Sequence, residues 1–558
     1  MFGLCFFSVS RDNLCTRKKA RASTRSIRTA MRSADFSVPP YERVNCMDLI
    51  IALSPILWLV IALSVLKIAA HKACTIALII ALVAGICYNN MTVEHAAQGT
   101  LEGVALACWP ILLVIIAAIF TYNLSLETKA MDTIKKMLAS VSSDQRVLIL
   151  LIGWGFGAFL EGMAGFGTAV AIPAGMLAGI GVNPILAASV CLIANTVPTA
   201  FGSIGIPVMT LASVTDMDAV QLAGYTAVQL APLALCCPAL MVMVAGKGIK
   251  GLKGMLIMCV VAGVALVVPE VFVAIFMGPE LAVIVGSVCT MAAIIACAKL
   301  FPVHDPKYQI EGASSDGSVS LGIGFKACLS FILIFVFLLL TSKLVPAINA
   351  PLSKIYSTVQ IFDASTGAPP YKFVWINTPG VLIFLAAFIG GTVQGASPSK
   401  LLSVLGKTVF NLRFTILTII TVIATAKVMG YAGMTNTIAV AAVGATGTAY
   451  PLVAAFIGSI GTFITGSATS SCVLFGKLQT DAAIAIGAGE HVQAWVTAAN
   501  ATGACAGKIV SPQSIAIAVA SIGVKGVEGR LLSFAVKFYI PFVIVMGLVV
   551  YFGQTIVP

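Results

Sequence analysis

Charged residues are scarce in this sequence: Asp, Glu, Lys and Arg together make up 10% of its 558 residues. A soluble protein of this size would contain about 25%. Hydrophobic residues make up 59%, and apolar runs of about 17–25 residues, each long enough to cross about 30 Å of hydrocarbon, recur along the chain. The composition excludes an ordinary soluble protein and predicts an all-α integral membrane protein.

Motifs for metal, redox and nucleotide chemistry are also missing. The 15 cysteines are scattered without a CxxC pair, and the four histidines never stand four residues apart. The pattern therefore predicts neither a metal site nor a cofactor, and it argues against a membrane-embedded enzyme or redox subunit. The chain has no GxxxxGK[ST] sequence, which argues against an ATP-driven pump. The net charge of +12 lies in the loops and predicts no nucleic-acid partner.

Residues 1–46 differ from the rest of the chain because they are basic, with nine Lys or Arg against three acidic residues. Their apolar start is too short for a signal peptide and precedes the basic cluster instead of following it. The positive-inside rule places the loop after the first span inside, so Met47 and the basic segment before it would lie outside. We therefore expect an over-extended start, with initiation near Met47, in preference to a functional tail.

Lysine and arginine also assign the other loops to the two sides of the membrane. The segments 67–72, 122–146, 247–253, 299–326 and 400–413 each contain several of these residues, whereas 89–103 contains none. The positive-inside rule places the former inside and 89–103 outside. Arg413 and Lys427 flank one span and fit anchoring or snorkelling side chains. The order of loops predicts about 12–14 helical elements, some of them broken. The expected spans lie near 49–66, 147–160, 164–181, 184–200, 219–245, 255–276, 280–298, 326–346, 374–396 and 413–430, with one long outer loop at 347–371.

One motif occurs twice in the chain. GAFLEG at 157–162 is matched by GTFITG at 461–466, and the Asn, Gly, Ile and Pro at 195, 202, 204 and 207 recur at 500, 507, 509 and 512. So many matches in order, with one residue of drift, indicate an internal duplication. Within a membrane domain at 47–558, repeat 1 covers about 122–300 and repeat 2 about 413–558. Internal repeats in a multi-span membrane protein are typical of secondary transporters, whose substrate site lies near mid-membrane where the repeats meet.

The relative orientation of the two repeats depends on the segment 434–448. This segment is too short and too polar at its ends to span the membrane, and we expect it in the interface. The helix at 449–465 then starts outside, whereas its counterpart at 147–160 starts inside. The two repeats are therefore predicted to be inverted.

Each copy of the motif is followed by a stretch in which the helical pattern fails, MAGFGT at 163–168 and SATSSC at 467–472. Irregular backbone at membrane depth is tolerated where protein or a water-filled cavity satisfies it, and the N–H groups that begin a half-helix attract anions. Close helix packing by small residues is the alternative, but the duplication favours a substrate site. The expected broken-helix residues are Gly162, Gly165, Gly167, Gly466 and Gly507. The expected substrate-binding residues are Asn195, Thr196, Ser203, Thr465, Ser467, Thr469, Ser470, Ser471, Asn500, Lys508, Ser511 and Gln513.

Two ionisable residues stand in these motifs. Glu161 is a carboxylate inside an apolar stretch, and burial disfavours the charged form of a carboxyl group, which suits a proton carrier. A structural carboxyl satisfied by nearby Ser or Thr is the alternative. Lys508 takes the place that Ser203 has in the first copy. It is placed to neutralise a substrate carboxylate or to pair with Glu161, and snorkelling to the interface is the alternative.

With these residues, the sequence resembles the L-lactate permease family of bacterial carboxylate transporters from about residue 48 to the end. The resemblance is carried by GAFLEGMAGFGTAVAI (157–172), NTVPTAFGSIGIP (195–207), TGSATSSCVL (465–474) and AANATGACAGKIVSPQSIAIA (498–518). It implies import of L-lactate, with D-lactate or glycolate as further substrates, by proton symport, and an inverted-repeat fold. The sequence departs from the family at Ala468, where the family usually has Asp between Ser and Thr.

We therefore expect a multi-pass protein of the cell inner membrane, monomeric or homodimeric, that imports a small 2-hydroxymonocarboxylate with H⁺ and without a cofactor. Another organic anion, such as gluconate or a dicarboxylate, stays open as the substrate. Na⁺ also stays open as the coupling ion, because the hydroxyl groups at 467–471 suit a cation as readily as an anion.

Overall fold

The computed structural model describes residues 45–557 except 67, 166, 304, 311–319, 343, 367, 369 and 525. The basic segment at 1–46 lies almost entirely outside the described residues, so the expected start near Met47 stays a prediction. The rest of the chain, Cys46–Pro558, forms one compact unit.

Helices make up most of this unit, and one hairpin of two strands interrupts their order among the described residues. The first half contains α2 (Cys46–Val60), α3 (Ala70–Cys87), α4 (Val93–Leu106), α5 (Leu113–Glu127), α6 (Ala130–Ala139), α7 (Gln145–Leu148), α8 (Gly157–Met163), α9 (Thr168–Gly179), α10 (Pro184–Ala194), α11 (Gly202–Thr215), α12 (Ala219–Ala245), α13 (Leu256–Phe276) and α14 (Ala282–Leu300). The second half contains α15 (Leu321–Thr341), α16 (Pro346–Ser353), β1 (Tyr356–Val359), β2 (Tyr371–Val374), α17 (Pro379–Val393), α18 (Pro398–Tyr431), α19 (Met434–Thr446), α20 (Tyr450–Thr465), α21 (Ala468–Ala485), α22 (Glu490–Val510), α23 (Pro512–Ile522) and α24 (Glu528–Gly553).

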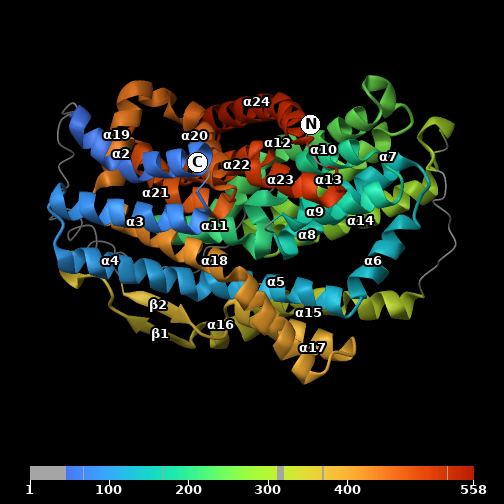
Figure 1. Cartoon of the computed structure of the whole chain (residues 1–558), viewed down its shortest axis with the longest axis horizontal. Coiled ribbons are helices and arrows are strands. Elements are labelled where there is room, and N and C mark those ends of the chain that lie inside the picture. The colour runs from blue at the N-terminus through green and yellow to red at the C-terminus, as the bar shows by residue number, and fades with distance from the viewer. Residues whose placement is uncertain are drawn as a thin grey trace, which may run out of the picture. The chain divides into compact units, whose positions relative to one another are not determined.

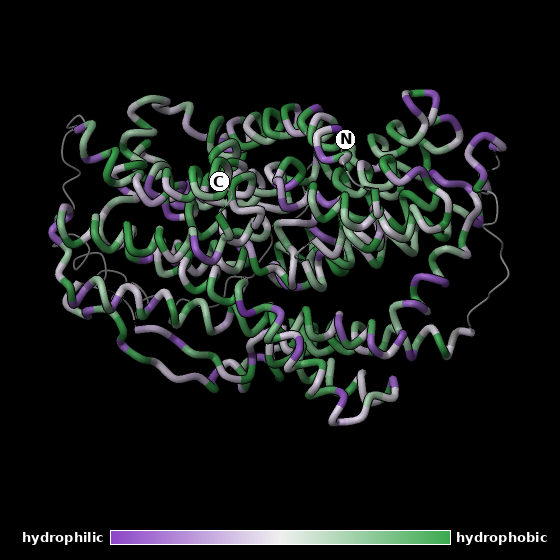
Figure 2. The backbone as a smooth tube through the Cα atoms, in the orientation of Figure 1, coloured by the Kyte–Doolittle hydropathy of each residue, from purple (hydrophilic) through white to green (hydrophobic). Residues whose placement is uncertain are grey.

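The helices confirm a multi-pass membrane architecture. Among the described residues, 12 helices are long and apolar enough to cross a membrane, or 13 if the bent pair α22 and α23 is counted as one span. Figure 2 shows hydrophobic residues along most of the long helices and hydrophilic residues mainly at their ends and in the connections. The helix count agrees with the predicted number of elements.

Several segments differ from the sequence-based expectation. The helices at three expected spans, Thr168–Gly179, Pro184–Ala194 and Pro379–Val393, have only 10–17 residues, and the segment 434–448, expected in the interface, belongs to the candidate span Met434–Thr465. The predicted inner loop at 400–413 is helical, because α18 runs without interruption from Pro398 to Tyr431. Ser397 caps its start by accepting a hydrogen bond from the Lys400 N–H, and no further proline interrupts it. The predicted outer loop at 347–371 contains α16 and most of the β1–β2 hairpin, in which Tyr356 pairs with Val374. Its strands are rich in Tyr, Thr, Phe and Val, which favour extended backbone.

Lys427 is not a snorkelling residue. Its ammonium group lies 2.8 Å from Glu102 Oε1, and the two side chains are 14% and 12% exposed. The Tyr431 hydroxyl donates a 2.6 Å hydrogen bond to Glu102 Oε2. This partly buried pair joins α18 to α4. The sequence pattern missed it because the two partners lie in different helices far apart along the chain.

The helices before and between the two predicted repeats form one packed group with α18, whose second half belongs to repeat 2. In this group α18 contacts α3, α4 and α5, and α17 contacts α5 and α15. Figure 1 shows α4, α5, α15 and α17 along the lower part of the view, with the helices of the two repeats above them.

The two repeats exchange their last half-helices. In repeat 1, α11 packs against α21 of repeat 2 as well as against α8 of its own repeat, while α23 of repeat 2 packs against α9 and α10 of repeat 1. The exchange is reciprocal, as expected if the two halves descend from one ancestral unit. The inverted orientation of the repeats stays a prediction.

Candidate functional site

Each repeat contains a helix pair joined by a short non-helical turn. In repeat 1, α8 ends at Met163, and Gly165 and Gly167 have φ values of +59° and +88° before α9 begins. In repeat 2, Gly466 has φ +71° between α20 and α21. Glycine reaches positive φ without the steric cost that a side chain brings. Three of the five glycines predicted for broken helices therefore lie at these turns.

A second break follows in each repeat. In repeat 1, Ser203, Ile204 and Gly205 have φ values of +47°, +61° and +75° inside α11. In repeat 2, Ser511 separates α22 from α23, and the two helices are bent by 46°. Each repeat thus has a turn between two helices and a later interruption.

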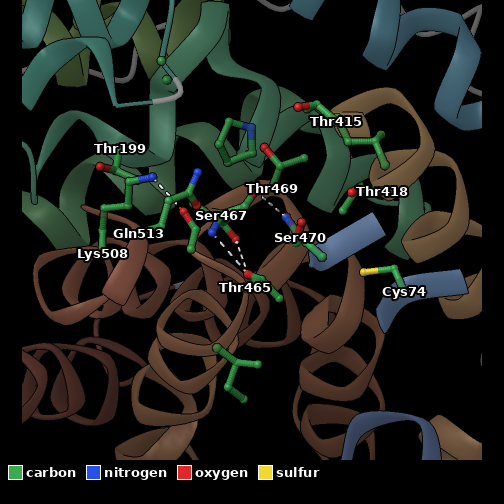
Figure 3. A pocket seen from close by; sticks show the side chains of 18 of the residues that line it. Cys74, Thr199, Thr415, Thr418, Thr465, Ser467, Thr469, Ser470, Lys508 and Gln513 are labelled. Carbon is green, nitrogen blue, oxygen red and sulfur yellow. Dashed lines mark hydrogen bonds between the residues drawn. The ribbon is translucent and has the colours of Figure 1, made fainter. Parts of the chain in front are cut away.

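Residues in or next to all four breaks line one cavity of about 480 Å³. Repeat 1 contributes Glu161, Gly165, Thr199, Gly202 and Ser203, and repeat 2 contributes Thr465, Gly466, Ser467, Ala468, Thr469, Ser470, Lys508 and Gln513. Figure 3 shows the hydroxyl-bearing residues of repeat 2 gathered beside Lys508 and Gln513, with Cys74, Thr415 and Thr418 on the facing side. Residues from both repeats therefore face the same space.

The duplicated position 203/508 has the same structural role in both repeats. Ser203 Oγ donates a 2.8 Å hydrogen bond to the carbonyl oxygen of Ala164, in the turn after α8. Lys508 Nζ donates a 2.8 Å hydrogen bond to the carbonyl oxygen of Gly466, in the turn after α20. In each repeat, this side chain thus links the second broken segment to the turn that joins the helix pair. Only Lys508 adds a charge.

That charge is poorly compensated. Lys508 is 6% exposed, and among the described residues no carboxylate lies within 4.0 Å of its ammonium group. The pairing with Glu161 that the sequence allowed is therefore not formed here. An ammonium group has three N–H donors, and the described contacts use one of them. A buried cation is costly unless an anion or hydrogen bonds compensate it, so an anion in the cavity would stabilise Lys508.

Two helix N-termini reinforce this electrostatic preference. Ser467 caps α21 by accepting a hydrogen bond from the Ser470 N–H at 3.2 Å, which leaves the N–H groups of Ala468 and Thr469 without partners inside the helix. Gln513 stands in the first turn of α23, and its position also lines the cavity. The N-terminus of a helix carries a partial positive charge that attracts anions. Both N-termini therefore favour the same sign of ligand as Lys508.

Glu161 lies on the repeat 1 side of the cavity. Its side chain is 3% exposed, and Oε2 is buried without a hydrogen-bond partner among the described residues. A Cβ atom at Gly202 would lie 2.8 Å from Glu161 Oε1, so the glycine makes room for the carboxyl group. Glu161 is the only Asp or Glu among the described residues that line the cavity. Ala468 lines the cavity as well and adds no second carboxylate.

Five residues predicted to bind substrate lie outside the cavity, in the packing around it. Asn500 Nδ2 donates to the carbonyl oxygen of Ser471 at 3.2 Å, and Asn500 Oδ1 accepts from Gln479 at 3.3 Å. The Ser471 hydroxyl donates to the Gly458 carbonyl oxygen. The remaining three are Thr196, which donates to Leu192, Ser511, which caps α23, and Asn195, whose buried side-chain amide has no partner among the described residues.

The other two predicted broken-helix glycines lie inside helices, where they allow close packing. A Cβ atom at Gly162 would lie 2.6 Å from Val283 on α14. A Cβ atom at Gly507 would collide with the carbonyl oxygen of Ser459 on α20. The chain does not turn at Gly162 or Gly507, whereas their counterparts have other roles: Gly466 lies in the turn after α20, and Gly202 leaves room for Glu161.

The cavity wall formed by α3 and α18 was missed by the sequence reasoning. The His71 ring stacks on Phe414 with ring centroids 4.5 Å apart, and Cys74, Thr415 and Thr418 line the same wall. The repeat pattern contained no signal for these residues, and the only hint was one of four histidines near the start of a span. No group of three or more His, Cys, Asp or Glu side chains in the described part of the chain is arranged to hold a metal ion.

Gly165→Ala is expected to lower the free energy of unfolding by about 1–3 kcal/mol. Alanine is strained at φ +59°, and its Cβ would collide with Ser203 Oγ. Gly179→Ala in α9 is the matched control, because no atom lies within 4 Å of its added Cβ. Thermal unfolding in detergent measures both variants. Equal midpoints for the two variants would contradict a requirement for glycine at the turn.

The sequence is similar to one protein family and to several curated proteins. Residues 48–557 match the family described as L-lactate permease. The L-lactate permease of Streptococcus iniae is 43% identical over 435 residues, covering 78% of this chain and 90% of its own length. The glycolate permease GlcA of Escherichia coli (strain K12) is 35% identical over 539 residues, covering 90% and 95% of the two chains. The solved structure of Neisseria gonorrhoeae MtrF is 14% identical, covers 82% of this chain and 84% of its own, and has a TM-score of 0.46.

Proposed function

Because the chain belongs to the L-lactate permease family, we propose that it is a secondary active transporter that imports a small 2-hydroxymonocarboxylate by proton symport. L-lactate is the proposed substrate, with D-lactate and glycolate as further substrates. The observation that carries the proposal is the buried, unpaired Lys508 in a cavity lined by the broken segments of both repeats. Membership in a permease family excludes the membrane-enzyme alternative.

The substrate carboxylate is placed at the repeat 2 side of the cavity. There Lys508 Nζ and the N-termini of α21 and α23 all favour an anion. The hydroxyl groups of Thr469 and Ser470 and the amide of Gln513 line the same side. Hydroxyl and amide groups donate and accept hydrogen bonds, which suits recognition of the 2-hydroxyl group. Substrate and Lys508 would then compensate each other's charge.

Glu161 is the proposed proton carrier. A monocarboxylate that crosses with one proton adds no net charge, so the transported pair avoids the cost of an ion in a low-dielectric interior. Glu161 faces the same cavity as Lys508 but belongs to the other repeat. A movement of one repeat relative to the other would therefore change the environments of the bound proton and the bound substrate together, as alternating access requires. The site lies within one chain, so monomer and homodimer are both compatible with the proposal.

The residues of α3 and α18 that line the cavity support a proposal for the side of the membrane from which the site is open. His71 is next to Lys72, and Phe414 is next to Arg413, and the loop charges predict that both basic residues lie on the inside. The cavity end lined by His71 and Phe414 is then its inner end. We propose that this conformation gives the site access from the inside.

A second candidate function is transport of another organic anion, such as gluconate or a dicarboxylate, with Na⁺ as the coupling ion. It is favoured by the row of hydroxyl oxygens at Thr465, Ser467, Thr469 and Ser470 along one side of the cavity. Oxygen ligands of this kind suit a hard cation as well as they suit a hydroxy acid. Ala468 leaves this side without a carboxylate, which would otherwise strengthen cation binding.

Uptake of labelled L-lactate into proteoliposomes tests the two functions. We expect an inward pH gradient to drive accumulation, with no requirement for Na⁺ on either side. Unlabelled D-lactate and glycolate should compete with L-lactate, whereas gluconate and dicarboxylates should not. A requirement for Na⁺ would overturn the proposed coupling. Absence of lactate uptake, together with uptake of gluconate or a dicarboxylate, would overturn the proposed substrate.

A further inference from the structure

A second carboxylate is buried in repeat 1, away from the cavity. Glu270 on α13 is 3% exposed, and its Oε2 atom has no hydrogen-bond partner among the described residues. The neighbouring positions on the same buried face of α13 are the apolar residues Ala262, Leu266 and Ala274. An apolar side chain would pack at position 270 without the cost of burying a carboxyl group. An ionisable side chain kept at membrane depth indicates a role in function.

Helix α14 places Glu270 at the same depth as Glu161. A Cβ atom at Gly286 of α14 would lie 3.3 Å from the Glu270 Cβ. Less than one turn away on α14, Val283 and Ile284 lie 2.6 Å and 3.0 Å from a Cβ placed at Gly162, the residue after Glu161. One turn of α14 therefore lies against both helices that carry the buried carboxylates. Only Glu161 lines the cavity.

Polar side chains of α12 and α22 lie at the same depth as Glu270. Gly224 packs against Ile275 and Gly263 packs against the Leu235 carbonyl oxygen, so the antiparallel helices α12 and α13 place Gln229 level with Glu270. The Gln229 amide donates to the Trp495 carbonyl oxygen at 2.8 Å and accepts from the Thr502 hydroxyl at 3.1 Å. Cys505, one turn further along α22, is the titratable side chain within electrostatic range of both carboxylates. No lysine or arginine forms an ion pair with Glu270 among the described residues.

Unpartnered polar atoms are concentrated in repeat 1. Among the described residues, buried side-chain oxygens or nitrogens without a hydrogen bond occur in six residues, and Thr462 is the only one in repeat 2. The five in repeat 1 are Glu161, Asn195, Thr210, Thr226 and Glu270. Buried polar groups are almost always satisfied by protein or by internal water. Repeat 1 therefore has more buried polar groups for internal water to satisfy, the two carboxylates among them, whereas in repeat 2 only Thr462 among the described residues lacks a hydrogen bond.

A second cavity lies beyond Glu270. It has a volume of about 280 Å³ and is lined by Met277, Asp218 and Glu280, among others. Met277 follows Glu270 by seven residues at the end of α13, about 10 Å along a helix. The loop charges predict that this end of α13 lies outside. Two acidic side chains thus stand at the outer end of the helix that carries Glu270.

We propose that Glu270 is a second proton-binding carboxylate of the transport cycle, which takes protons from the outer cavity and passes them through internal water to Glu161. The proposal rests on the proton symport proposed above. A proton from water binds the Glu270 carboxylate, and its transfer to the Glu161 carboxylate restores the Glu270 anion. Protons and charge balance without a further reactant. Glu270 does not touch the substrate, which distinguishes its role from that of Glu161.

Two assays on the full chain in proteoliposomes separate this role from a structural one. Net uptake of labelled L-lactate driven by a pH gradient requires protons to bind and leave. Exchange of labelled for unlabelled L-lactate at equal pH requires no net proton movement. We expect Glu270→Gln to retain exchange close to the wild-type rate while its net uptake falls at least about tenfold, because a positioned proton-transfer group typically contributes about 10²–10⁴-fold. Glu270→Asp keeps a carboxyl group and should restore much of the net uptake, with its pH profile displaced.

The other outcomes would overturn the proposal. Net uptake in Glu270→Gln at the wild-type rate would show that protons do not pass through Glu270, while the symport itself would stand. Loss of exchange as well as net uptake in folded Glu270→Gln would assign Glu270 a structural role. If Glu270→Gln does not fold, Glu270→Asp decides, since a pH profile unchanged from wild type would contradict the relay. Failure of the wild-type protein to accumulate lactate on a pH gradient would instead refute the proposed symport, and the relay with it.

Discussion

Lys508→Met is expected to weaken the apparent affinity for L-lactate at least about 100-fold. Removing one partner of a buried charge pair typically costs about 3–5 kcal/mol, and each 1.4 kcal/mol is about tenfold in affinity. Lys508 donates its only described hydrogen bond to the Gly466 carbonyl oxygen, so a substrate carboxylate would be its counter-charge. Methionine has a similar length and removes the charge. The concentration dependence of labelled lactate uptake, together with lactate binding to the purified protein, measures the change.

Lys400→Met is the matched control for this variant. Lys400 pairs with Glu127 at 2.8 Å, but the two side chains are 46% and 38% exposed. Exposed ion pairs contribute about 0–1 kcal/mol, and neither residue lines the cavity. The Lys400→Met variant should therefore bind lactate with the affinity of the wild type. If Lys508→Met also binds lactate normally, Lys508 only ties α22 to the turn at Gly466, and the anion binds elsewhere.

Glu161→Gln is expected to abolish lactate accumulation driven by a pH gradient, with a loss of at least about 100-fold. Glutamine has almost the same shape as glutamic acid and fits the space that Gly202 leaves, but it cannot bind and release a proton. Glu161 is also the only carboxylate among the described residues that line the cavity, so no neighbouring acid replaces it there. The variant should retain lactate exchange at equal pH, because a permanently neutral side chain resembles the protonated state.

Initial rates of net uptake and exchange, measured in the same proteoliposomes, test this expectation. Glu490→Gln is the control, since Glu490 is exposed in the first turn of α22, outside the cavity. It should leave both rates unchanged. Accumulation that persists in Glu161→Gln would exclude Glu161 as the proton carrier and would leave the transport of lactate itself untouched.

Much of the fold could be predicted because its causes are local or periodic. Apolar runs of membrane length specify the spans, and glycine clusters specify the turns at Gly165 and Gly466. The repeat offset aligned Lys508 with Ser203, and both side chains bind the carbonyl oxygen of a turn. The length of α18 was wrong in the prediction, because Lys and Arg between 400 and 413 indicated a loop although nothing there breaks a helix.

The site was less predictable, because a residue that recurs in both repeats can serve helix packing and need not bind substrate. Asn500 recurs in the motif yet serves helix packing through Gln479 and Ser471. His71 and Phe414 lie in helices that approach the cavity only in three dimensions. Glu102 and Lys427 pair across two helices, which no single stretch of sequence reveals. Glu270 did have a signal, because it stands in the apolar run VVPEVF and meets the same criterion that selected Glu161.

The exchange of half-helices between the repeats also sets the order in which the protein can mature. Glu161 and Lys508 are about 350 residues apart, which corresponds to about 20–70 s of synthesis at typical ribosomal rates. Throughout that interval α9 lacks α23, its partner from repeat 2. Glu161 is then already in the bilayer, but Lys508, which faces the same cavity, has not yet been synthesised. The ribosome must therefore release nearly the whole chain before the cavity exists. A nascent chain arrested before α22 would be inserted in the membrane but unable to bind an anion at this place.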